Sequence, residues 1–340
     1  MLANRLRVTM GLFFVTGAVC ALGQTLQLHP PHLAGSDVTL TWDATTNRVM
    51  VGELDGWGDS PRWFGVVETN TTRVLTYTNE VPERALFVLR DIRSISFPEP
   101  ALEAAVRSQI PNKSMPTNEV FDIDLEAIDS LSAATLGISD LSPLVHLTSA
   151  TNLVLFFNAV EDLGPLGGLT QLLAVDLEGN DIDDLGPLAS LTQLTELNIA
   201  FNFVEDLSPL SGLTQLRELD ARSNLLLDIS PLASLTALRE LNLGGNLDVT
   251  NATPVAALSA LEAIDLSGTA IDDATPLAGL LQLNFINMND TLLTDLTPFI
   301  NIAENGDLGN GGTLSLEGVP VANTNQITVL RSHGVTVVFP

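Results

Sequence analysis

The sequence predicts an α/β fold: a right-handed solenoid of short parallel strands with a 3₁₀ or extended convex side, a helical N-terminal cap, and a small all-β sandwich domain before it. Three observations support this prediction. Proline, asparagine and aspartate recur with a period of 22 residues, with one extra residue before Pro254. Apolar residues alternate within each period, and the stretch before the repeats contains short runs of β-forming residues without a period. A fixed period of about 20 to 29 residues is typical of a solenoid, because each coil buries its apolar face only against its neighbours.

The first residues predict an export signal. Two arginines precede an apolar run over residues 8–22, which has about the length of a signal-peptide core and is too short to span a bilayer. The small residues Ala21 and Gly23 place the cleavage before Gln24, so residues 1–23 are the predicted signal peptide. We therefore expect a secreted or periplasmic protein with no membrane insertion after signal cleavage.

Cys20 leaves a lipoprotein as the less favoured alternative. Lipidation of this cysteine would hold the protein at a membrane surface. A lipobox usually has leucine three residues before the cysteine, where this chain has Gly17. The sequence therefore favours cleavage before Gln24.

Residues 24–95 predict a small antiparallel β-sandwich. Short runs rich in β-forming residues are separated by clusters of Asn, Asp, Gly and Pro, which is typical of such a domain. These runs cover residues 38–42, 48–51, 64–67, 73–77 and 85–89. The Leu40-Thr41-Trp42 strand and the ending at Arg90 resemble the fibronectin type III-like modules of bacterial secreted proteins. All three tryptophans lie in this region, where we favour packing between strands over a sugar-stacking site.

Residues 96–127 predict a helical cap. After Pro98 and Pro100 the sequence places Leu102, Val106 and Ile110 on one face of a short amphipathic helix. Such a helix can cover the first coil of a solenoid, whose apolar core would otherwise face water.

The repeats occupy residues 128–304 and predict eight coils. Within one coil, Leu197 and Ile199 alternate as the inward side chains of a short strand. Asn202 follows at the turn, where its amide can satisfy backbone groups in a stacked ladder. Asp206 stands two residues before a Ser-Pro step and can cap a short turn. The prolines that set the period and stop a long convex helix are Pro143, Pro165, Pro187, Pro209, Pro231, Pro254, Pro276 and Pro298.

The repeat unit is similar to a known family. The segments Asp-Leu-Gly-Pro-Leu at 184–188 and Asp-Leu-Ser-Pro-Leu at 206–210 resemble the 22-residue units of internalin-type bacterial leucine-rich repeats. The first coil departs from this pattern with Leu136 in the asparagine position, and the last two have Thr269 and Thr291 there. The resemblance implies a leucine-rich-repeat solenoid with a helical N-cap, and with residues 305–340 as a C-terminal cap that contains a last strand at Leu314–Leu316.

The charge limits the classes of partner. The chain has 41 acidic and 14 basic residues, which gives a net charge of −27 at pH 7. Such a field repels phosphate backbones and anionic lipids, so we expect no nucleic-acid partner. A protein ligand with a basic patch fits the charge; the oligomeric state stays unknown.

The sequence shows no catalytic constellation. It contains no nucleophile elbow, Walker loop or zinc-binding helix, and its four histidines form no recognisable ligand set. The recurring aspartates could form a calcium ladder, but we favour capping because each one precedes a Pro turn. We expect no enzyme, no cofactor and no metal.

The concave face is the predicted binding surface. Strand positions beside the inward leucines carry acidic residues, and phenylalanines gather in the strand-to-turn positions of two coils. Aromatic clusters rimmed by charge are typical interface anchors, although the rings could instead pack against neighbouring coils. The candidate ligand-binding residues are Phe156, Phe157, Asp176, Glu178, Glu196, Phe201, Phe203, Glu218, Asp220 and Arg222.

The sequence thus favours a secreted or periplasmic binding protein that recognises a protein ligand on this face. A glycan-binding adhesin is one alternative, although phenylalanine is a poorer sugar platform than tryptophan. A structural cell-envelope spacer without a specific ligand is the second, and a hydrolase is the weakest. The step from fold to function depends on the family resemblance and on the surface, since a fold alone fixes no function.

Overall fold

The computed structural model describes strands between residues 27 and 91 together with residues 94–110, 119–320 and 324–339. The chain divides into two compact units. One contains the strands before residue 95 and the segment Glu119–Asp124, and the other contains residues 96–110 and the described residues from Leu125 onward. The predicted signal peptide, its cleavage site and Cys20 lie outside the described residues.

The first unit contains two antiparallel sheets. In one, β3 pairs with β1, β2 and β6, and in the other, β4 pairs with β5 and β7. Strands β3 to β7 fall on the five runs that the sequence predicted as strands. The likeness to fibronectin type III modules stays a prediction. The seven strands are β1 (Gln27–Leu28), β2 (His32–Ala34), β3 (Asp37–Asp43), β4 (Arg48–Leu54), β5 (Arg62–Glu68), β6 (Arg73–Tyr77) and β7 (Leu86–Asp91).

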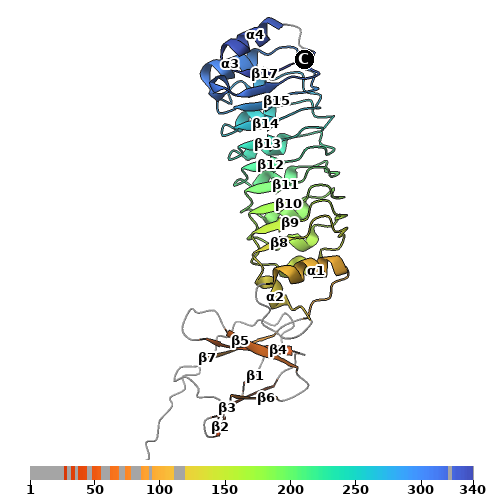
Figure 1. Cartoon of the computed structure of the whole chain (residues 1–340), viewed down its shortest axis with the longest axis vertical. Helices are drawn as coiled ribbons and strands as arrows, with labels where there is room; N and C mark the ends of the chain where they lie inside the picture. The colour runs from red at the N-terminus through yellow and green to blue at the C-terminus, as the bar shows by residue number, and fades with distance from the viewer. Residues whose placement is uncertain are drawn as a thin grey trace, which may run out of the picture. The chain divides into compact units, whose positions relative to one another are not determined.

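The second unit is a solenoid of stacked coils with one parallel sheet of ten strands (Figure 1). Every strand has three residues, and the middle residue is buried in all of them, including Val337 in the last strand, β17. The strands are β8 (Ser130–Ser132), β9 (Asn152–Val154), β10 (Ala174–Asp176), β11 (Glu196–Asn198), β12 (Glu218–Asp220), β13 (Glu240–Asn242), β14 (Ala263–Asp265), β15 (Phe285–Asn287), β16 (Thr313–Ser315) and β17 (Thr336–Val338).

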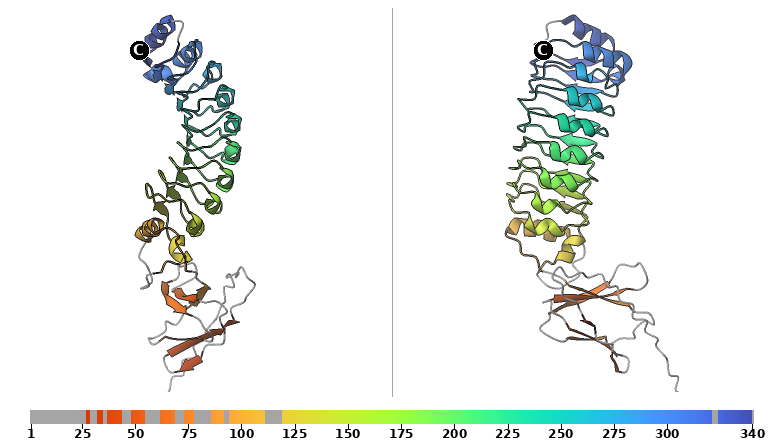
Figure 2. Two further views of the ribbon diagram at one scale, coloured as in Figure 1. Left: turned by 90° about the vertical axis from the view of Figure 1, so that its right-hand side faces the viewer. Right: turned by 180° about the vertical axis from the view of Figure 1, so that it is seen from behind.

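The convex side of the first seven coils consists of 3₁₀ helices, as predicted. Figure 2 shows these helices along one side of the solenoid and the strands along the other. Each helix has proline in its first turn, where the missing N–H costs no hydrogen bond. They are η1 (Ser142–His146), η2 (Gly164–Leu166), η3 (Gly186–Ser190), η4 (Ser208–Gly212), η5 (Ser230–Ser234), η6 (Thr253–Ala257) and η7 (Thr275–Leu277).

The eighth coil corrects the expectation that no full helix occurs on the convex side. There α3 (Thr297–Asn305) is a nine-residue α-helix, followed by η8 (Asp307–Asn310). Strand β16 begins 28 residues after β15, against 22 for most coils, so the chain has room for a helix before it returns. The helix buries Phe299 and Ile302.

Caps close both ends of this unit. Helix α1 (Pro100–Gln109) buries Leu102 and Val106 and packs against β8, whereas Ile110 lies beyond the helix end. The Glu99 carboxylate before α1 accepts hydrogen bonds from the backbone N–H groups of Ser139 and Asp140. Helix α4 (Thr324–Ser332) packs against α3 and β17 at the other end. A short helix, α2 (Asp122–Glu126), precedes β8.

The core is a stack of aliphatic columns with an asparagine ladder beside it. Leu197 and Ile199 are buried, as are their counterparts in the other coils. The Asn202 side chain accepts a hydrogen bond from the Ile182 N–H of the preceding coil and donates to the Leu177 and Ile199 carbonyls. No helix in the described part of the chain is long and apolar enough to cross a membrane.

Candidate functional site

The exposed ends of the strand side chains line an open hollow of about 600 Å³ that extends from β9 to β15. Because side chains alternate along a strand, the first and third residue of each strand face the hollow while the second is buried. Four of the predicted residues lie in it: Asp176, Glu196, Glu218 and Asp220. The hollow also contains Glu240, which the prediction did not include.

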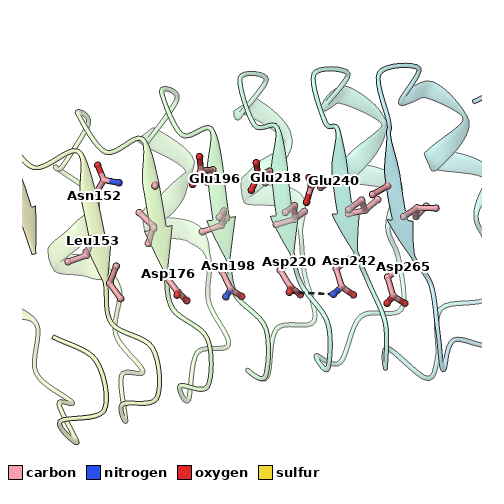
Figure 3. A pocket seen from close by; sticks show the side chains of 18 of the residues that line it. Asn152, Leu153, Asp176, Glu196, Asn198, Glu218, Asp220, Glu240, Asn242 and Asp265 are labelled. Atoms are coloured by element: carbon pink, nitrogen blue, oxygen red, sulfur yellow. Dashed lines mark hydrogen bonds between the residues drawn. The ribbon is translucent and has the colours of Figure 1, made fainter. Parts of the chain in front are cut away.

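Two polar rows cross the hollow (Figure 3). The upper row consists of Glu196, Glu218 and Glu240, which are register partners on adjacent strands. Adjacent strands lie about 4.8 Å apart, so these carboxylates repel one another. Burial, together with the charges of Glu196 and Glu240, raises the pKa of Glu218.

The second row alternates acid and amide: Asp176, Asn198, Asp220, Asn242, Asp265 and Asn287. The amides separate like charges. Asn242 and Asn287 donate hydrogen bonds to Asp220 and Asp265 at 3.4 and 2.7 Å, and Asn198 donates to Glu178 beside the row. Burial is the main reason that the pKa values of Asp176 and Asp220 are raised. This row is thus largely hydrogen-bonded within the fold, whereas the glutamate row has no amides between its members.

Arg222 contacts three of the other predicted residues. Its guanidinium lies 2.7 Å from the Asp220 carboxylate and 3.0 Å from that of Glu178, two coils away. It also lies 5.1 Å from the centre of the Phe201 ring, within the range of a cation–π interaction. The intervening coil has the buried Ala200 at this position, so the long side chain can pass over it. Arg222 therefore neutralises part of the acidic surface.

The four predicted phenylalanines lie outside both the core and the hollow. Phe157, Phe201 and Phe203 are about half exposed, at 55%, 47% and 53%, and Phe156 is half-buried. Phe156 and Phe157 come two and three residues after β9, and Phe201 and Phe203 come three and five residues after β11. We call these four residues the phenylalanine edge. Phe156 and Phe157 meet edge to face, with centroids 5.8 Å apart.

Two of these rings are held in a left-handed backbone conformation. Phe157 and Phe201 have φ values of 51° and 54°, at a turn position that is glycine in three coils, as at Gly179 and Gly245. The Phe157 ring occupies the space that a side chain at Gly179 would need. A bulky residue with positive φ costs about 1–3 kcal/mol, so these rings are retained at a cost to stability.

The apolar surface continues into leucines that the prediction missed. Leu225, Leu227 and Leu247 are 53%, 70% and 73% exposed. The signal was present in the sequence: within Leu225-Leu226-Leu227, strict alternation around the buried Leu226 places both neighbours outside.

The aspartate column has a local role in each coil. The Asp206 carboxylate accepts a 2.7 Å hydrogen bond from the Ser208 N–H, and the same contact recurs at Asp162, Asp184 and Asp228. Hydrogen bonds from Ser208 lower the pKa of Asp206. Within the described residues, no group of three or more His, Cys, Asp and Glu side chains could hold a metal ion. The predicted capping role is therefore confirmed by these hydrogen bonds.

Comparisons with known proteins agree with this geometry. The family model for Leucine Rich repeats (2 copies) matches residues 174–212 and 214–256. Internalin C2 from Listeria monocytogenes is 31% identical, and the match covers 66% of this chain and 94% of that one with a TM-score of 0.58. No curated protein sequence matches the chain.

Two further internalin structures from Listeria monocytogenes share the fold. InlF is 26% identical, and the match covers 72% of this chain and 75% of that one with a TM-score of 0.58. The functional domain of InlJ is 22% identical, with 72% and 56% covered and a TM-score of 0.57. The repeat family and its exposed sheet support a protein-binding role in general. With a 22-residue repeat, a ten-strand parallel sheet and this likeness to internalin C2, the chain belongs to the internalin-type bacterial leucine-rich-repeat proteins.

Proposed function

We propose that the chain is a secreted or periplasmic binding protein that recognises a protein ligand through the hollow and its phenylalanine edge. The observation that carries this proposal is the row of Glu196, Glu218 and Glu240, three partly exposed carboxylates in register with no cation among them. Their field favours a basic patch on the ligand. The exposed rings beside them offer apolar anchors of the kind that dominate interfaces.

The rigidity of the surface also supports binding. The sheet is fixed on its buried face by a continuous aliphatic core, so the exposed carboxylates are held in place before a ligand arrives. Preorganised surfaces lose less entropy on association. A glycan-binding adhesin is less well supported, since none of the described residues of the hollow is a tryptophan or tyrosine. We propose no catalytic role.

Removing two charges from the glutamate row should slow association. A partner enriched from the native secretome on the immobilised full chain would be measured against Glu196→Gln/Glu218→Gln at several salt concentrations. We expect the association rate to fall by about 3- to 10-fold at low salt, and its salt dependence to flatten, because long-range attraction acts mainly on association. Glu161→Gln/Glu304→Gln removes the same charge from exposed positions elsewhere and should leave the rate near that of the parent.

The same assay tests the aromatic edge. Phe156→Ala and Phe201→Ala should each lower the affinity for the partner by about tenfold or more, mainly through faster dissociation. The proposal fails if Glu196→Gln/Glu218→Gln associates with the partner as fast as Glu161→Gln/Glu304→Gln does, and if the phenylalanine variants bind as tightly as the parent. The binding surface would then lie elsewhere.

Export has its own test. We expect the exported protein to begin at Gln24, because Ala21 and Gly23 fit the small-residue rule for signal cleavage. Intact-mass analysis of the protein recovered outside the cytoplasm measures this directly. A lipid-modified Cys20 would contradict the expectation and place the protein on a membrane surface.

A further inference from the structure

An apolar patch lies on the solenoid flank beyond the strand ends. We define this flank patch as Phe203, Leu225, Leu227 and Leu247, each more than half exposed. Phe203, Leu225 and Leu247 follow the stacked residues Asn202, Asn224 and Asn246 in three consecutive coils, so they form a continuous row. Contiguous exposed apolar groups of this kind mark interaction sites rather than ordinary surface.

Two of the four patch residues have no free backbone N–H for a partner strand. The backbone N–H of Phe203 donates to the Ile182 carbonyl, and that of Leu225 donates to the Val204 carbonyl. Because these two amides already bond to the neighbouring coil, a partner strand cannot pair with them, and contact through side chains is favoured. Docking through side chains alone is the mode of an amphipathic helix that lies on an apolar surface.

The dimensions and the charges of the patch specify this helix further. Three coils extend over about 10 Å, which is the rise of about seven helical residues, so an apolar stripe at i, i+3, i+4 and i+7 matches the row. Exposed carboxylates follow the patch residues along the chain, at Glu205, Asp228 and Asp248. A complementary helix therefore carries Lys or Arg beside its apolar stripe.

We infer that the flank patch binds an amphipathic helix of a partner protein, with the leucines of the patch against its apolar stripe and the surrounding carboxylates against its basic residues. The inference rests on the proposed function, since it names the kind of partner that this side of the solenoid recognises. The net charge of −27 argues against a second copy as the occupant, because two such chains repel.

The test uses the full chain and three fluorescent peptides of about 18 residues, enough for five helical turns. The first peptide places Leu and Lys on opposite faces of a helix, the second has the same composition in scrambled order, and the third has Glu in place of Lys. Anisotropy titrations should give at least tenfold tighter binding for the first peptide than for the second, and no binding for the third.

The variant Leu225→Ser/Leu247→Ser should abolish the preference for the amphipathic peptide and leave the scrambled peptide unchanged. Leu173→Ser, an exposed leucine just before β10 and so at the opposite end of the strands, is the control and should bind as the parent does. Circular dichroism verifies that each variant is folded. A preference that persists in the double variant overturns the inference.

Other outcomes separate the patch from the hollow. If Glu196→Gln/Glu218→Gln weakens both cationic peptides equally and the leucine variant changes nothing, the hollow attracts charge and the inference about the patch is wrong. If the leucine variant alone removes binding of the amphipathic peptide, the patch is its site and the inference is supported. The role of the hollow is decided separately, by the association rate of the captured partner with Glu196→Gln/Glu218→Gln. A parent dimer that Leu225→Ser/Leu247→Ser dissociates in sedimentation, or leucine-dependent binding to phosphatidylcholine vesicles, would identify a different occupant and also overturn the inference.

Discussion

Leu197→Asp is expected to lower the free energy of unfolding by about 4 kcal/mol or more. Leu197 is the middle residue of β11, is 2% exposed, and stacks between Val175 and Leu219 on the adjacent strands. The substitution removes a buried leucine, which costs about 2–5 kcal/mol in a core, and adds a carboxylate without a partner. Urea denaturation followed by circular dichroism measures the change.

Asn198→Asp is the matched control. It introduces the same charge one residue later, on the exposed side of the same strand, where the amide donates to Glu178. We expect a loss of about 1–2 kcal/mol, from the lost hydrogen bond to Glu178 and from repulsion by Asp176 and Asp220 on the adjacent strands. Equal stability of Leu197→Asp and the parent would mean that the buried face of the strand is assigned wrongly.

The solenoid was predictable because each coil repeats the same physical requirements. Alternation identifies Leu197 as inward, and the spacing of Asn202 and Asp206 from it indicates a turn and a cap. The structure confirms these three roles with burial and hydrogen bonds. The α3 helix was not predictable in this way. Pro298 keeps the regular spacing and so indicates another short turn, but the chain between β15 and β16 is longer than in the other coils and allows a helix.

The candidate site was predictable only in part. The same alternation places Glu196 and Glu218 on the exposed side of the sheet, and both line the hollow. The contact of Arg222 with Glu178 spans two coils and depends on how a long side chain passes over Ala200, which a repeat pattern does not contain. The exposed Leu225 was missed because leucine in such a repeat is usually a core residue.

The asparagine ladder connects stability to the candidate surface. Asn202 is 5% exposed, and its side chain bonds to the Ile182 N–H and the Leu177 carbonyl of the preceding coil and to Ile199 and Ala200 in its own. Asn202→Leu keeps the number of side-chain heavy atoms but leaves the buried Ile182 N–H without an acceptor. The Leu177, Ile199 and Ala200 carbonyls each lose one donor and keep another, from Asn180, Asn224 and Gly179. One buried unsatisfied group costs about 1–3 kcal/mol, and the weakened carbonyl bonds add to this, so we expect a total loss of about 2–4 kcal/mol in urea denaturation.

Asn202→Thr should lie between the parent and the leucine variant. Thr269 occupies the same position three coils later, where its hydroxyl donates to the Leu266 carbonyl of its own coil, so threonine keeps one local bond and loses those to the preceding coil. Asn158→Leu, in the half-buried first ladder position, should cost less than Asn202→Leu because water can reach the groups it abandons.

Asn202 also lies between Phe201 and Phe203, so its turn presents both rings. Asn202→Leu is therefore expected to lower both the affinity for a captured partner and the free energy of unfolding. Phe201→Ala should lower the affinity while the protein stays folded. If Asn202→Leu were as stable as the parent, the ladder would not hold the turn. If it lost stability and still bound the partner fully, the phenylalanine edge would not be part of the interface.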